Sequence, residues 1–197
     1  MHINTLCVCG AGTMGSGIAQ VAARSGFFTL VYELNSVILH NAKESVEKNL
    51  QALVEKKKMS QEEKEKIFQR IQFTGDIQTC LADVFIEAIV EKPEAKVALF
   101  NQLAELNHSE TVFATNTSSL SVTAIAARIK NPERVIGMHF FNPAPLMKLV
   151  EVVNTKYTNE QTSGIITALA KQMGKTPVIC KDSPGFIVNQ VARPYYI

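Results

Sequence analysis

Residues 3–33, INTLCVCGAGTMGSGIAQVAARSGFFTLVYE, decide the fold class of this protein. The stretch opens with an apolar run over Ile3–Val8 and closes with a second one over Thr29–Glu33, and each has the length of a buried strand. Between them, Met14–Arg24 is rich in small residues and stops before Gly26, which suits a helix that lies close to a sheet. The order strand, helix, strand predicts two parallel strands joined by a helix, the building unit of an α/β fold.

The turn before this helix reads Gly10-Ala11-Gly12-Thr13-Met14-Gly15. Gly10 permits a tight turn, Gly12 lets the backbone approach a pyrophosphate, and Gly15 allows close packing of the helix on the strand. The helix N-terminus at Thr13 and Met14 then faces the anion. We therefore predict that Gly10, Gly12, Thr13, Met14 and Gly15 bind a dinucleotide; glycines that serve an ordinary turn are the alternative.

Glu33 ends the second apolar run, where a carboxylate can accept hydrogen bonds from the 2′ and 3′ hydroxyls of an adenosine ribose. The same carboxylate would repel a 2′-phosphate, and the residues that follow, Leu34–Ser36, include no arginine. The sequence therefore predicts NAD rather than NADP as the cofactor. The alternative is a Glu33 that is merely solvated.

The rest of the chain continues the alternation of strand-like and helix-like segments without an internal repeat. This pattern predicts an α/β fold with a Rossmann-type, mostly parallel sheet and flanking helices. The segments Val37–Lys58 and Gln61–Arg70 are charged and strongly helix-forming, which predicts a helical arm that projects from the sheet. Further strands are expected at Val84–Val90, Thr111–Ala114, Val135–Met138, Leu149–Val153 and Pro177–Cys180.

Composition limits the classes of function. The 197 residues carry a formal net charge of +2 with mixed signs, which gives no footprint for nucleic acid. No apolar run is long enough to cross a membrane, and no basic leader is visible, so we expect a cytoplasmic protein with no membrane partner. The four cysteines are too scattered for a disulfide framework. Cys7 and Cys9 could share one face of a strand, but no second pair matches them, so we predict no metal site.

Three segments that carry candidate functional side chains follow predicted strands or lie beside them: Asn116–Ser119, Met138–Pro143 and Lys148–Glu151. Ligands of open α/β sheets bind at the carboxyl ends of the strands. A histidine side chain can take up and release a proton, so His139 can transfer one, while Glu151 can stabilise the imidazolium that forms. A histidine that only fills the core is the alternative.

The chain closely resembles the 3-hydroxyacyl-CoA dehydrogenase family over essentially its whole length, through Glu87–Glu91, Asn116–Leu120, His139–Val152 and Lys181–Asn189. The resemblance implies an NAD-dependent oxidoreductase that interconverts a (3S)-3-hydroxyacyl-CoA and a 3-oxoacyl-CoA, in fatty-acid β-oxidation or butanoate metabolism. It implies that His139 is the catalytic acid/base and that Glu151 holds and polarises it. It also places Ser118 and Asn189 at the reacting oxygen, Glu91, Lys96, Ser118 and Asn142 at the nicotinamide end of NAD, and Asn49 and Lys56 at the acyl-CoA.

Members of this family continue into a helical C-terminal domain that dimerises and closes the substrate site. We expect residues 1–182 to form the NAD-binding domain with the His-Glu pair, and residues 183–197 to be the start of the C-terminal domain, which is largely absent. A helix is expected from Pro184, capped by Asp182 or Ser183.

That closing helix would carry an apolar side, so we expect the chain to associate as a homodimer or a larger assembly. The acyl-CoA site would be open to water without the C-terminal domain, so this chain alone is expected to be weakly active or inactive. The apolar side would consist of Val188, Val191, Tyr195 and Ile197.

Two other functions remain open at this point. The wider β-hydroxyacid dehydrogenase group shares the nucleotide-binding start but relies on a catalytic lysine, where this chain offers His139 with Glu151. The non-enzymatic alternative is a family member or fragment that binds NAD in a structural or binding role without dehydrogenase activity. Glu33 also departs from the aspartate usual in the family, which predicts a change in NAD affinity rather than in cofactor type.

Overall fold

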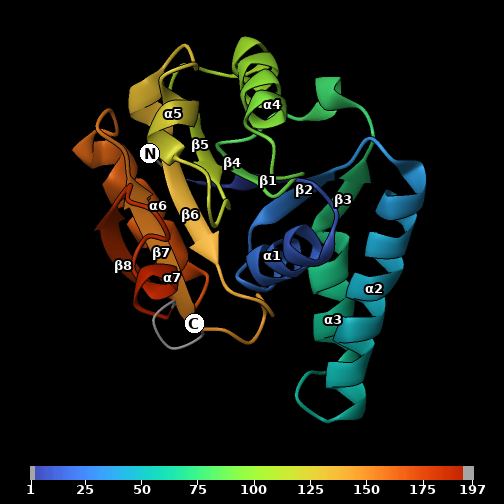
Figure 1. Ribbon diagram of the computed structural model, residues 1–197. Helices are drawn as coiled ribbons and strands as arrows, with labels where there is room; N and C mark the ends of the chain where they lie inside the picture. The colour runs from blue at the N-terminus through green and yellow to red at the C-terminus, as the bar shows by residue number, and fades with distance from the viewer. Residues whose placement is uncertain (1–2, 193–197) are drawn as a thin grey trace.

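The computed structural model describes residues 3–192, which form a single sheet with helices on both faces (Figure 1). Within these residues the sheet has eight strands in the order β3-β2-β1-β4-β5-β6-β7-β8. The strands are β1 (Thr5–Cys9), β2 (Phe28–Tyr32), β3 (Ile71–Thr74), β4 (Val84–Glu87), β5 (Val112–Thr115), β6 (Val135–Phe140), β7 (Leu149–Asn154) and β8 (Thr176–Lys181). The α-helices are α1 (Thr13–Arg24), α2 (Ser36–Glu55), α3 (Gln61–Gln69), α4 (Pro93–Leu106), α5 (Val122–Ala126), α6 (Glu160–Gln172) and α7 (Val188–Ala192).

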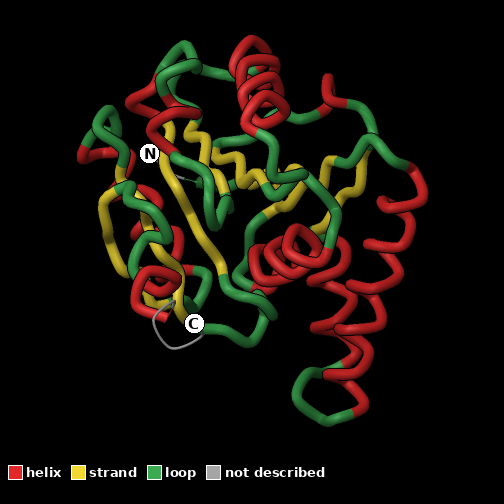
Figure 2. The backbone as a smooth tube through the Cα atoms, viewed as in Figure 1, coloured by secondary structure: helices red, strands yellow, loops and turns green. Residues whose placement is uncertain are grey.

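The predicted Rossmann-type, mostly parallel sheet is confirmed. All neighbouring strands run parallel except β6 and β7, which are antiparallel. Figure 2 shows the strands between two layers of helix. One core packs α1, α2, α3 and α6 against the sheet, and the other packs α4 and α5 against the opposite face. The carboxyl ends of β1, β2, β4 and β5 therefore meet at one edge, where α1 begins.

Two strand predictions need correction. The sequence misses β3, IQFT, because polar residues alternate with apolar ones in this edge strand and only its first residue is buried, so it shows no apolar run like those of β4 and β5. The strand predicted over Val84–Val90 ends at Glu87. The three residues that follow leave the sheet and form the loop against which Gly10 turns: a Cβ on Gly10 would lie 2.6 Å from the carbonyl oxygen of Ala88.

The projecting helical arm is formed by α2 and α3, which extend together beyond the edge of the sheet (Figure 1). Asn35 caps α2 by accepting hydrogen bonds from the backbone of Val37 and Ile38. Ser60 and Glu63 cap α3 reciprocally. Only a narrow stripe of α2 is buried, so most of this long helix faces solvent; the stripe is Ala42, Val46 and Leu50.

The predicted C-terminal helix begins later than expected. Residues 183–186 form a turn in which the amide of Phe186 donates to the carbonyl of Ser183, and α7 begins only at Val188. Asp182 does not cap this helix, because its carboxylate accepts hydrogen bonds from Ser121 and Thr123 at the start of α5. The prediction of a helix from Pro184 with a cap at Asp182 or Ser183 is therefore wrong, and Tyr195 and Ile197 lie outside the described residues.

The cysteines lie mainly in the core. Cys7, Cys9 and Cys80 are completely buried, and burial raises the pKa of the Cys7 thiol well above its ordinary value. In residues 3–192 no group of three or more histidine, cysteine or acidic side chains could hold a metal ion. No helix in this part of the chain combines the length and the apolar character needed to cross a membrane.

Candidate active site and cofactor clefts

The glycine turn contains two positions at which the fold requires glycine and one position at which glycine leaves room for a ligand. Gly10 has a φ of +98°, and a Cβ on Gly15 would lie 1.8 Å from the carbonyl oxygen of Gly10, so neither position accepts a side chain. A Cβ on Gly12, by contrast, would meet nothing within 4 Å. Gly12 precedes α1 and no side chain caps the helix there. The residues thus leave open space in front of a helix N-terminus, which fits the pyrophosphate of a dinucleotide.

A largely apolar cleft of about 530 Å³ opens on one side of this turn. Its walls come from the ends of β1 and β2, from the loop after β4 and from α4. Glu33 lies at this cleft, and its carboxylate accepts hydrogen bonds from the amides of Ala11, at 3.2 Å, and Asn35, at 3.0 Å. The cleft has a size and lining that suit an adenosine, and the Glu33 carboxylate is placed where it could accept hydrogen bonds from a ribose.

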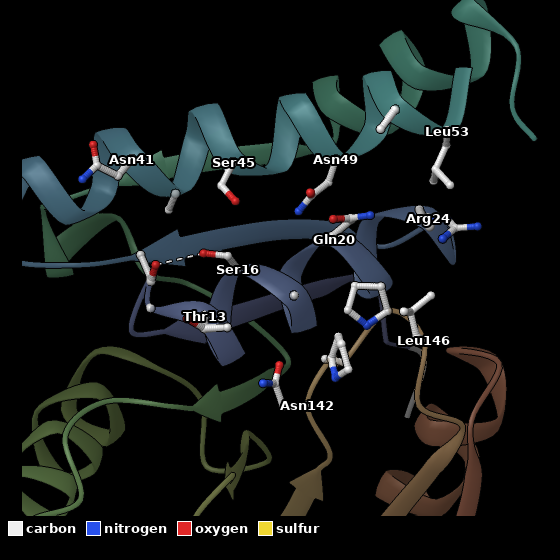
Figure 3. A pocket seen from close by; sticks show the side chains of 18 of the residues that line it. Thr13, Ser16, Gln20, Arg24, Asn41, Ser45, Asn49, Leu53, Asn142 and Leu146 are labelled. Carbon is white, nitrogen blue, oxygen red and sulfur yellow. Dashed lines mark hydrogen bonds between the residues drawn. The ribbon is translucent and has the colours of Figure 1, made fainter. Parts of the chain in front are cut away.

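A second cleft, of about 590 Å³, lies on the other side of α1, between this helix, α2 and the loop over 142–146 (Figure 3). The predicted residues Asn49 and Lys56 line it from α2, and Thr13 and Asn142 line it at the glycine turn. Met14 lines neither cleft, because its side chain packs against the core. Met14 can therefore face a cofactor only through its backbone.

His139 and Glu151 are directly opposite each other on the antiparallel strands β6 and β7. The Nδ1 of His139 lies 2.6 Å from Glu151 Oε2, and the two residues are 6% and 1% exposed. The rings of Phe141 and Phe186 flank the imidazole. Because an ionised carboxylate only accepts hydrogen bonds, Nδ1 carries the proton in this pair and Nε2 is left as the base.

The other oxygen of Glu151 is held by the start of α7. Its Oε1 accepts hydrogen bonds from the amides of Ile187, at 3.0 Å, and Val188, at 2.8 Å. The sequence analysis missed these two groups, because a backbone amide carries no signal in the residue type. They connect the His-Glu pair to the C-terminal segment of the described chain.

A network of polar side chains surrounds Glu91, in the loop that follows β4. Its carboxylate accepts hydrogen bonds from Thr117 and from Ser119, the latter at 3.1 Å, and lies 3.1 Å from the ammonium of Lys96. Lys96 is only 1% exposed, and its Nζ lies 2.6 Å from the buried Glu87. The predicted position of Lys96 at the nicotinamide end stays a prediction; in the structure its ammonium is buried and pairs with Glu87 and Glu91.

Burial raises the pKa of the Glu91 carboxyl, but the hydrogen bond from Thr117 and the charge of Lys96 outweigh it, so the pKa is lower than usual. Ionised Glu91 therefore stabilises the folded state above the unfolded-state pKa of about 4.3, and this contribution is lost as the pH falls through the lower folded-state pKa.

We expect Glu91→Gln to lower the free energy of unfolding more at pH 7 than at pH 3, as measured by urea titration. The exposed carboxylate variant Glu105→Gln is the control, and an equal loss for Glu91→Gln at both pH values would contradict the prediction.

Ser118 and Asn189 come together from distant parts of the chain. The side-chain amide of Asn189, on α7, donates to the carbonyl oxygen of Ser118 at 3.4 Å. The neighbouring Asn116 accepts a hydrogen bond from the amide of Phe140 at 2.8 Å, which ties the end of β5 to the end of β6. The loop after β5, the histidine strand and α7 therefore converge on one place.

Comparisons with known proteins agree with this geometry. Residues 5–183 match the family described as "3-hydroxyacyl-CoA dehydrogenase, NAD binding domain". The chain is 48% identical over 197 residues to the 3-hydroxyadipyl-CoA dehydrogenase of Escherichia coli, a match that covers all of this chain and 42% of that protein. It is 43% identical to a probable 3-hydroxybutyryl-CoA dehydrogenase of Bacillus subtilis, covering 98% of this chain and 68% of that protein.

Solved structures give the same result. A crystal structure of a 3-hydroxybutyryl-CoA dehydrogenase from E. coli superimposes with a TM-score of 0.97 at 48% identity, covering 100% of this chain and 42% of that one. The (S)-3-hydroxybutyryl-CoA dehydrogenase of Ralstonia eutropha superimposes with a TM-score of 0.96 at 36% identity, covering 98% of this chain and 69% of that one. The chain thus spans less than half of the E. coli relative and about two thirds of the others. The chain belongs to the 3-hydroxyacyl-CoA dehydrogenase family and matches the NAD-binding domain of that family. The cofactor of the chain is NAD.

Proposed function

We propose that this chain carries the cofactor site and the catalytic pair of a dehydrogenase that interconverts a (3S)-3-hydroxyacyl-CoA and a 3-oxoacyl-CoA. The observation that carries the proposal is the buried His139–Glu151 pair of an NAD-binding fold, in which Nδ1 and Oε2 lie 2.6 Å apart. Relatives at 48% and 43% identity are named 3-hydroxyadipyl-CoA dehydrogenase and probable 3-hydroxybutyryl-CoA dehydrogenase, which supports this reaction class.

His139 supplies the acid/base chemistry. Nε2 takes the proton of the 3-hydroxyl group as the alcohol is oxidised and returns it in the reverse direction. Glu151 fixes the tautomer through Nδ1 and stabilises the imidazolium, and it need not take up a proton itself. The amides of Ile187 and Val188 occupy the second oxygen of Glu151, so the carboxylate cannot rotate away from the histidine.

The cofactor site is divided between the two sides of the glycine turn. When bound, NAD accepts a hydride from C3 of the alcohol or returns it to the ketone. The amides at the start of α1 hold the pyrophosphate, and Glu33 accepts hydrogen bonds from the ribose hydroxyls. Glu91 and Asn142 orient the nicotinamide end of NAD. Lys96 holds Glu91 in place through an ion pair.

Ser118 and Asn189 stabilise the reacting oxygen as it passes between hydroxyl and carbonyl. Their joint position, with the Asn189 amide 3.4 Å from the Ser118 carbonyl, supports this assignment. The acyl-CoA lies along the cleft between α1 and α2, where Asn49 donates or accepts hydrogen bonds and Lys56 meets a phosphate.

An assay of NADH oxidation with acetoacetyl-CoA tests the proposed reaction. We expect slow oxidation by the 197-residue chain, and faster oxidation when the chain is extended by the helical domain of a relative. The extension closes the acyl-CoA site and fixes Asn189 on α7. The proposed function would be contradicted if both proteins bind NADH and acetoacetyl-CoA in calorimetry but neither protein oxidises NADH.

Cofactor selectivity provides a separate test at Glu33. We expect Glu33→Ala to narrow the preference for NAD over NADP by about 1–3 kcal/mol, because a charged hydrogen bond to the ribose is lost together with the repulsion of the 2′-phosphate. Fluorescence titration of both cofactors measures the change. Glu105→Ala, an exposed carboxylate variant on α4, should leave both affinities unaltered. Binding of NADP as tight as that of NAD by the unaltered chain would refute the assignment of Glu33.

We also propose that residues 1–182 form the NAD-binding unit and that residues 183–197 are the start of the C-terminal domain. We propose further that the chain self-associates through its C-terminal segment. Ile179 on the edge strand β8 and Val191 on α7 are 55% and 60% exposed, which supports an apolar contact surface. We expect sedimentation to show a dimer or larger species that Val191→Glu weakens, whereas Leu81→Glu, at another exposed apolar position, does not. A strictly monomeric chain would contradict this proposal.

We propose a cytoplasmic location, which rests on the likeness to bacterial relatives. Relatives named as mitochondrial also match the chain, at 40–42% identity, so cell fractionation is the deciding measurement. Recovery in an organelle fraction would overturn the proposal.

A further inference from the structure

One polar side chain in the wall of the second cleft has no partner. Gln20 lies on α1 and is 3% exposed, yet its Oε1 accepts no hydrogen bond. The same residue lines the cleft between α1 and α2, where Figure 3 shows it between the two helices. A buried amide oxygen without a donor is unfavourable, because it loses its hydrogen bonds to water and gains none in return.

Packing alone does not explain a glutamine at this position. The other buried residues of α1 are small or apolar: Gly15, Ile18, Ala19, Val21, Ala22 and Ala23. A leucine or a methionine would fill a similar volume on this face without burying an unpaired amide. The carboxamide is therefore suited to a partner that enters the cleft.

The lining of the cleft indicates the chemistry of that partner. Figure 3 shows that Thr13 and Asn41 lie toward one end of the cleft and that Arg24 and Leu53 lie toward the other. Lys56 also lines the cleft, and none of its described lining residues is acidic. Gln20 lies two helical turns from Gly12, about 12 Å along the axis, which is beyond the pyrophosphate at the helix N-terminus. The cleft thus offers neutral amides in its middle and cations beyond them.

We propose that Gln20 forms a hydrogen bond with a secondary amide in the pantetheine arm of acyl-CoA. The inference rests on the proposed function, which places the thioester at His139 and the phosphates near the cations. The pantetheine arm joins these two ends and contains two secondary amides. A carboxamide both donates and accepts hydrogen bonds, so Gln20 pairs with either the N–H or the C=O of such an amide. Gln20 is thus a substrate-binding residue for the arm common to all acyl-CoA esters, whatever their acyl chain.

Calorimetric binding to the 197-residue chain tests this role without a need for turnover. The ligands are CoA, adenosine 3′,5′-bisphosphate, which lacks the pantetheine arm, and NAD. We expect Gln20→Leu to raise the Kd for CoA about 10-fold, because one hydrogen bond is lost and an amide of the arm is left unpaired. The Kd values for the bisphosphate and for NAD should not change. The thermal midpoint of Gln20→Leu should be equal to or above that of the unaltered chain, since the substitution removes an unpaired buried amide.

Two further variants serve as controls. Gln20→Met keeps an unbranched side chain of similar length and should reproduce the loss for CoA, including in the case that Gln20→Leu fails to fold. Gln172→Met replaces an exposed glutamine at the end of α6, far along the chain from the cleft, and should bind all three ligands like the unaltered chain.

Three results would overturn the inference. If Gln20→Leu and Gln20→Met bind CoA as tightly as the unaltered chain does, Gln20 is not a substrate-binding residue. The proposed function would remain intact in that case. An equal loss for CoA and the bisphosphate, or a loss for NAD, would mean that the side chain shapes the cleft and does not pair with the arm. An unaltered chain that binds NAD but not CoA would overturn the proposed function, and the inference with it.

Discussion

His139→Gln is expected to lower the rate of hydride transfer about 10²–10⁴-fold and to leave the affinity for NAD unchanged. Glutamine occupies a similar volume and can still donate to Glu151, but it cannot take up the proton of the 3-hydroxyl group. Cofactor binding is expected to be spared, because His139 lies on β6 and the proposed pyrophosphate site lies at the start of α1. Single-turnover NADH formation and calorimetric NAD titration measure the two quantities separately.

His108→Gln is the matched control, because His108 is exposed on the loop after α4 and lies far along the chain from Glu151. This variant should keep both the rate and the affinity. Glu151→Gln should act in the same direction as His139→Gln, because an imidazolium without its carboxylate forms less readily. A His139→Gln variant with a rate within threefold of the unaltered chain would show that another group transfers the proton.

The second large effect is expected at Gly12. Gly12→Val should weaken NAD binding roughly 100-fold, which corresponds to about 3 kcal/mol, because the new side chain fills the space where the pyrophosphate approaches the backbone. The fold should survive, since a Cβ at this position meets nothing within 4 Å and the backbone φ of −68° is available to any residue. Calorimetry gives the affinity, and circular dichroism gives the thermal midpoint.

Gly164→Val is the control for this substitution. Gly164 lies on α6, and a Cβ there also meets nothing within 4 Å, so the two variants add the same side chain to open space. Only Gly12→Val should lose NAD. Gly15→Val should instead fail to fold, because a Cβ at that position would lie 1.8 Å from the carbonyl oxygen of Gly10. Retention of NAD affinity by Gly12→Val would refute the location of the pyrophosphate.

The sequence predicts the first βαβ unit and the sheet class well, because the signals are local. The apolar runs, the glycine turn and Glu33 fall within 31 consecutive residues, and the turn geometry follows from glycine itself. The strand β3 escapes prediction because it is a short edge element whose stability comes from pairing with β2.

Sequence analysis predicts only those parts of the site that are formed by side chains of a characteristic type. The register that pairs β6 with β7 places His139 opposite Glu151, in agreement with the residues that the family resemblance singles out. The amides of Ile187 and Val188 escape prediction, since their contact with Glu151 depends on the turn over 183–186 and not on residue type. The burial of Lys96 beneath Glu91 and the unpaired Gln20 depend on tertiary packing in the same way.

The most direct test of the account is a single turnover with the chain in excess. The chain is mixed with saturating NAD and either (3S)- or (3R)-3-hydroxybutyryl-CoA, and the absorbance of NADH is followed over time. We predict NADH from the (3S) substrate, none from the (3R) substrate, and a rate at least about 100-fold lower for His139→Gln. The claim that this chain carries the catalytic pair of a dehydrogenase would be contradicted if NAD and the (3S) substrate both bind in calorimetry, but neither the chain nor the chain extended by the helical domain forms NADH at any time.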